Sequence, residues 1–89
     1  MYRYEELRNT VFTEKGQETF LKIRDNVHRL IELAGAFSMG KAISGVVGTN
    51  WEHMACVDRL VELAEIKEVT APGTVRGQDR IFCKAFRTA

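Results

Sequence analysis

The segment Gly48–Thr70 constrains the fold more than any other part of the chain, because three local signals follow one another within it. Thr49 or Asn50 can cap a helix, since a short side-chain oxygen accepts hydrogen bonds from first-turn N–H groups. Apolar residues then recur at three- and four-residue spacing, which predicts a helix over 51–64 with one buried face. The β-branched content of 66–70 predicts a short strand, and a Pro-Gly pair ends it. Few folds place a helix directly before a strand and a glycine-rich loop.

Two further helices are expected upstream. Thr13 is a suitable N-cap for a helix over 14–34, whose apolar stripe extends over four turns, and Gly35 ends it as a left-handed residue. Residues 36–38 form a brief extended link in this prediction. The spacing of apolar residues over 39–47 predicts a second helix, weakened by two internal glycines that each cost about 1 kcal/mol relative to alanine.

The two ends of the chain are less sharply defined. Residues 1–12 show helical spacing but are too short to form a stable helix alone, so we expect an arm that packs on its own domain or on a second subunit. Residues 71–79 predict a loop, and 80–86 a second strand that completes a hairpin. The alternation in that strand leaves open whether Phe82 or Cys83 faces inward.

Length and composition describe one small globular domain. The chain has 89 residues, of which 45% are hydrophobic, and no apolar run approaches the roughly 20 residues that cross a bilayer. The first residues lack the apolar core of a secretory signal, so a cytoplasmic protein is expected. The net charge is +1, but acidic residues prevail over 51–70 and basic residues over 71–89, which makes the C-terminal part the first place to look for a polyanion site.

The order of these elements resembles a winged helix-turn-helix domain. Leu60–Ile66 is similar to the end of that family's recognition helix, and Gly77–Phe82 is similar to the return strand of its wing. The layout resembles the MarR-like and ArsR-like bacterial regulators. The resemblance implies an α+β, mostly α fold, with three helices and a C-terminal β-hairpin wing in a domain over 13–89, preceded by a short arm or helix over 1–12.

The resemblance also implies a DNA-binding regulator of transcription, of a class that favours homodimers. The third helix would enter the major groove of double-stranded DNA, where Asn50 could read adenine and His53 could meet guanine or a phosphate. The wing would contact the phosphate backbone. The candidate DNA-binding residues are Lys41, Asn50, Trp51, His53, Arg59, Thr74, Arg76, Gln78, Arg80 and Lys84.

A different class of function follows from the acidic third helix. Glu52 would repel phosphates, and Glu52, Asp58 and Glu62 could instead face a basic protein partner. Trp51 would then be an exposed anchor of that interface, where tryptophan is enriched, although packing beneath the second helix is the expectation for it. In this alternative the winged helix is a protein-interaction module that ignores DNA.

Catalytic chemistry finds little support in the sequence. His53 and Cys56 are three residues apart on a helix, but a structural zinc needs four ligands and a Cys–His nucleophile needs an orienting partner. Both Cys56 and Cys83 are expected to be free thiols. We therefore expect no enzyme, no metal and no cofactor.

Overall fold

The computed structural model describes residues 2–71 and 73–85, and within them it forms an α+β fold that is mostly helical. The helices are α1 (Tyr4–Val11), α2 (Glu14–Ala34), α3 (Met39–Ala42) and α4 (Asn50–Glu62). The strands are β1 (Ala36–Ser38), β2 (Ile66–Glu68) and β3 (Ile81–Lys84), with a 3-10 turn, η1 (Gly77–Asp79), before β3. Pro72 and the predicted last strand residue, Phe86, lie outside the described residues.

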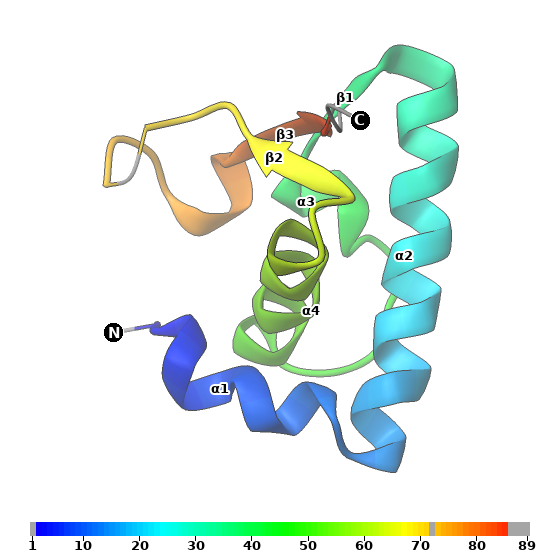
Figure 1. Ribbon diagram of the computed structural model, residues 1–89, viewed down its shortest axis with the longest axis vertical. Coiled ribbons are helices and arrows are strands. Elements are labelled where there is room, and N and C mark those ends of the chain that lie inside the picture. Colours follow the sequence, from blue (N-terminus) through cyan, green and yellow to red (C-terminus); the bar gives the residue numbers. More distant parts are fainter. Residues whose placement is uncertain (1, 72, 86–89) are drawn as a thin grey trace.

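Helix α4 lies at the centre, with α2 along one side, α1 across one end and the sheet at the other (Figure 1). Its residues 53–57 and Leu60 are buried. Phe20, Ile23 and Val27 of α2 contribute to the same core, as the predicted apolar stripe requires. Helix α4, the predicted third helix, therefore packs against α1, α2, α3 and β2.

Local capping fixes both ends of α2 and the start of α4 where the sequence predicts them, whereas α4 ends at Glu62, two residues before the predicted end. Thr13 Oγ1 accepts a hydrogen bond from Gly16 N at 3.0 Å, and Gly35 ends α2 with φ +77°. Thr49, rather than Asn50, caps α4 and accepts from Glu52 N at 3.2 Å. These groups would otherwise be left without partners at the helix termini.

The predicted extended link over 36–38 is a paired strand, and this pairing is not evident from the sequence. It pairs antiparallel with β3, which also pairs with β2, so the sheet order is β1-β3-β2. Phe37 lies opposite Phe82, and their rings stack with centroids 5.6 Å apart. Phe82 is fully buried, so its face of β3 is the inner one. The two strands predicted as a hairpin are therefore part of a three-stranded sheet.

The second helix is shorter than predicted. Helix α3 has only four residues, and the chain turns at Gly45, whose φ of +77° is not helical. The residues from Ile43 to Val47, predicted as helix, are a turn and loop instead, because Gly45 takes a left-handed conformation that ends the helical path.

The N-terminal arm is a helix that packs on its own domain. Val11 of α1 is 1% exposed, and α1 contacts both α4 and α2. Tertiary contact thus stabilises a helix that would be marginal in isolation.

Candidate nucleic-acid interface

The first turn of α4 and the loop before β3 form the two walls of an open recess. Its volume is about 470 Å³, and its lining residues are Asn50, Trp51, Met54, Arg76, Gly77, Gln78 and Asp79. Four predicted DNA-binding residues, Asn50, Trp51, Arg76 and Gln78, therefore converge here from two distant parts of the sequence. The other lining residues were not predicted, because Met54 belongs to the core stripe by its spacing and Gly77 and Asp79 carry only turn signals.

Close contact between the loop and α4 shapes this recess. A Cβ atom on Gly77 would lie 2.8 Å from Met54 Sδ, so the loop approaches α4 closely here and a larger residue would have to displace the Met54 side chain. The turn is closed by backbone bonds from Asp79 N to Arg76 O at 2.9 Å and from Arg80 N to Gly77 O at 3.3 Å. The three polar side chains of 76–79 are exposed on this framework.

Trp51 is half-exposed in the recess. The sequence predicted instead that it would pack beneath the second helix. The residue is 47% exposed, and its indole meets the Tyr2 ring edge-on with centroids 6.4 Å apart and an interplanar angle of 66°. This T-shaped contact with Tyr2 helps to hold the indole in place. No sequence pattern pointed to Tyr2.

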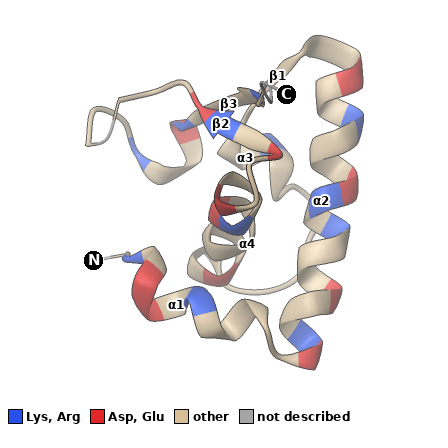
Figure 2. Cartoon of the chain, in the orientation of Figure 1, with Lys and Arg blue, Asp and Glu red and all other residues tan. Residues whose placement is uncertain are grey.

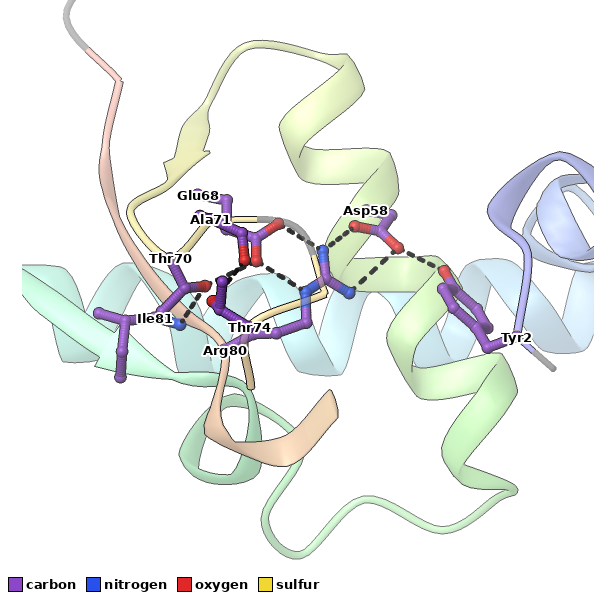
Figure 3. A network of polar contacts seen from close by, with 8 residues as sticks. All are labelled: Tyr2, Asp58, Glu68, Thr70, Ala71, Thr74, Arg80 and Ile81. Carbon is purple, nitrogen blue, oxygen red and sulfur yellow. Dashed lines mark hydrogen bonds and ion pairs between the residues drawn. The ribbon is translucent and has the colours of Figure 1, made fainter. Parts of the chain in front are cut away.

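Arg80 does not present its charge to solvent as the wing prediction assumed. Its guanidinium donates to Asp58 of α4 at 2.8 Å and to Glu68 of β2 at 2.9 and 3.0 Å (Figure 3). Asp58 also accepts a hydrogen bond from the Tyr2 hydroxyl, and Glu68 accepts one from Thr70 at 2.7 Å. Arg80 therefore ties the loop to the body of the domain.

The pKa values within this network follow from its contacts. Burial alone would lower the pKa of Arg80, but hydrogen bonds to Glu68 and Asp58 outweigh it and the net pKa is raised. The hydrogen bond from Arg80 holds the pKa of Glu68 below its usual value. Both groups stay charged at neutral pH, which keeps the ion pairs intact.

His53 is also removed from any partner surface. Its exposed fraction is 3%, and Nε2 lies 3.1 Å from Val47 O, so the ring fastens the loop before α4. The predicted contact of His53 with a base or phosphate does not fit this position. Cys56, three residues further along α4, is buried as well, so both residues belong to the core.

The remaining predicted residues lie outside the recess. Arg59 is paired with Glu62 at 2.5 Å and lies over the Phe12 ring. Thr74 is exposed in the loop and donates to Ala71 O at 2.6 Å. Lys84 lines a different open depression beside α2, together with His28 and Glu65. Lys41 is exposed on α3, the helix that contacts η1.

Helix α1 also packs against α4. Tyr4 donates to Glu62 at 3.0 Å, and Arg8 pairs with the same carboxylate at 3.0 Å. The exposed residues of α4 are therefore Asn50, Trp51 and Glu52 in its first turn and Glu62 near its end. A partner can reach the start of this helix more readily than its middle.

Charge is unevenly available on the described surface. Acidic and basic residues alternate along α2, which gives that helix no single-sign face (Figure 2). Among residues 2–71 and 73–85, Arg76 and Lys41 take part in no ion pair, unlike Arg8, Arg24, Arg59 and Arg80. Arg76 lines the recess, and Lys41 lies on α3, the helix that contacts η1.

The described part of the chain shows no group of residues suited to metal binding, thiol chemistry or membrane insertion. No cluster of three or more His, Cys, Asp and Glu residues there could hold a metal ion. Both cysteines are free, and burial, then the charge of Glu52, raises the pKa of Cys56 to about 11, so it remains a thiol at neutral pH. None of the described helices has the length and apolarity needed to cross a membrane.

Comparison with known proteins returned no relative. The chain matches no protein-family model, no curated protein and no solved structure. Its function is therefore inferred from the arrangement of its own residues.

Proposed function

We propose that the chain is a small winged-helix DNA-binding protein that regulates transcription. The order α2, β1, α3, α4, β2, loop and β3 supports this assignment, because it is the element order on which the resemblance depends. The observation that carries the proposal is the convergence of Asn50, Trp51, Arg76 and Gln78 on one open recess beside a loop that projects from the sheet (Figure 1).

The proposed mode of binding uses the start of α4 and the loop over 73–79. Arg76 and Lys41 contact phosphates, and they supply most of the affinity through release of counterions. Asn50 and Gln78 reach base edges, where an amide side chain can pair with adenine. Arg80 acts indirectly by holding the loop against α4.

The geometry favours DNA over a basic protein partner. Asp58 is engaged by Arg80 and Tyr2, and Glu62 by Arg8, Arg59 and Tyr4. A basic partner would have to displace these intrachain cations. Of the three acidic residues, only Glu52 is exposed and has no ion pair with another residue that the structure describes.

Binding to a random-sequence DNA duplex over a salt series tests the proposal. We expect log K to fall linearly with log salt concentration, and the Arg76→Ala/Lys41→Ala double variant to weaken binding to all sequences alike. Two lost phosphate contacts should reduce the salt slope by about 2. The matched control is Lys22→Ala, which removes an exposed charge from α2 and should leave affinity nearly unchanged. Absence of binding by the unaltered chain at low salt would reject the proposal.

A further inference from the structure

Some side chains that line the recess have no role in binding a phosphate backbone. Backbone binding needs cations, whereas this recess adds a half-exposed indole, two amides and a carboxylate around the apolar Met54. An indole face binds nucleobases by stacking, and amides and carboxylates bind their polar edges. The combination fits a base that has left the helical stack.

We propose that the recess receives a single unpaired guanine base of a nucleic acid, with its adjoining phosphate on Arg76. This inference rests on the proposed function, and it names the part of the nucleic acid that this site takes. Trp51 supplies the stacking surface. Asn50 and Gln78 flank the base, and Asp79 binds its Watson–Crick edge.

The stacking platform is held in place before any ligand arrives. The Tyr2 ring packs against the indole in a T-shaped arrangement, and Thr49 caps the helix turn that carries Trp51. The opposite wall is fixed because Arg80, the residue that follows the recess, is bound to Asp58 and Glu68. A site of about 470 Å³ lies within the range of roughly 300–1,000 Å³ usual for small-molecule pockets. Preorganisation of this kind lowers the entropy lost on binding.

Asp79 determines the choice of base. Asp79 is an exposed lining residue of the recess, and its carboxylate has no hydrogen-bond or ion-pair partner among the residues that the structure describes. An ionised carboxylate only accepts hydrogen bonds. Guanine presents two adjacent N–H donors, N1–H and N2–H₂, on its Watson–Crick edge, and each carboxylate oxygen can accept from one of them. The other bases offer a single donor group there.

The one tryptophan of the chain provides a direct probe. DNA hairpins with one unpaired guanine at the end should quench Trp51 emission, whereas the same hairpin with that base paired should not. Binding should be roughly tenfold tighter for the unpaired probe, as stacking of one base allows. Replacing the unpaired guanine with adenine, cytosine or thymine should remove most of this gain.

Two variants separate stacking from edge recognition. Trp51→Ala, followed with labelled hairpins, should bind paired and unpaired probes equally, while Leu33→Ala, which removes another exposed apolar side chain, should keep the preference. Asp79→Asn lies on the exposed loop and should fold normally, but it should lose the preference for guanine over the other bases.

The outcomes distinguish this inference from the proposed function. Salt-sensitive duplex binding with no quenching and equal affinity for both probes would overturn the guanine site and leave DNA binding standing. Equal quenching by all four bases, unchanged in Asp79→Asn, would overturn the assignment of guanine. Failure to bind any of these DNA probes would overturn both.

Discussion

The guanidinium of Arg80 lies 2.8 Å from the carboxylate of Asp58, which joins the end of the loop to the middle of the central helix. The two side chains are 18% and 13% exposed, and Glu68 completes the network from β2 (Figure 3). A residue that seemed to belong to a solvent-exposed wing therefore belongs to the structural frame of the recess.

Replacing Arg80 should destabilise the fold. Arg80→Met leaves two partly buried carboxylates without their cation, and we expect the free energy of unfolding to fall by about 2 kcal/mol, below the 3–5 kcal/mol of a fully buried pair. Urea denaturation measures this change. Arg76→Met is the control, because Arg76 is exposed and its loss should change stability by no more than about 0.5 kcal/mol. Equal stability of the two variants would show that the network contributes nothing.

The hydroxyl groups of Tyr2 and Tyr4 should contribute differently to the free energy of unfolding. Both hydroxyls donate to carboxylates of α4, but the Tyr2–Asp58 bond is partly buried and the Tyr4–Glu62 bond is exposed. Tyr2→Phe should therefore cost about 1.5 kcal/mol of unfolding free energy, and Tyr4→Phe about 0.5 kcal/mol or less. Chemical denaturation of the two single variants compares them directly; a larger loss in Tyr4→Phe would contradict the role given to burial.

Alkaline pH should weaken the attachment of this segment. Burial, and then the hydrogen bond to Glu62, raises the pKa of Tyr4 to about 12, and burial followed by the bond to Asp58 raises the pKa of Tyr2 as well. The folded state then holds protons that the unfolded state releases near pH 10, so this contribution is full below pH 10 and is lost as the pH rises through the folded pKa.

Unfolding free energies measured between pH 10 and 12 test that sign. The decline should be smaller in the Tyr2→Phe/Tyr4→Phe double variant than in the unaltered chain. Since the chain has only two tyrosines, phenolate absorbance reports their titration without interference from others. Titration of both at the ordinary value of 10 would contradict the predicted shifts.

Two glycines with positive φ should respond differently to alanine. Gly45 has φ +77° and open space around it, so Gly45→Ala should cost only the backbone term of about 1 kcal/mol. Gly48 has φ +136°, and its Cβ would lie 2.9 Å from His53 Nε2. Gly48→Ala should cost about 2 kcal/mol, because it adds displacement of the buried His53 to the backbone strain.

Thermal unfolding can resolve this difference, since about 1 kcal/mol shifts the Tm of a domain of this size by roughly 4–8 °C. Equal Tm values for Gly45→Ala and Gly48→Ala would indicate that His53 moves without cost.

The local sequence predicted α2 and α4 well because their ends depend on neighbouring residues. Thr13 and Thr49 accept hydrogen bonds from groups three residues away, and Gly35 adopts its left-handed conformation at the expected helix end. The same reasoning missed β1, because three residues carry too little pattern and Phe37 gains its strand partner, Phe82, from far along the chain.

The sequence by itself determined both ends of α2, the start of α4 and the strand that follows α4. Only the tertiary structure decided which polar and aromatic residues are available to a partner. His53 turned inward to Val47, and Arg80 turned to Asp58, 22 residues away, and to Glu68, 12 residues away. Helix capping acts within one turn, whereas burial and ion pairing depend on segments that meet only after the chain has folded.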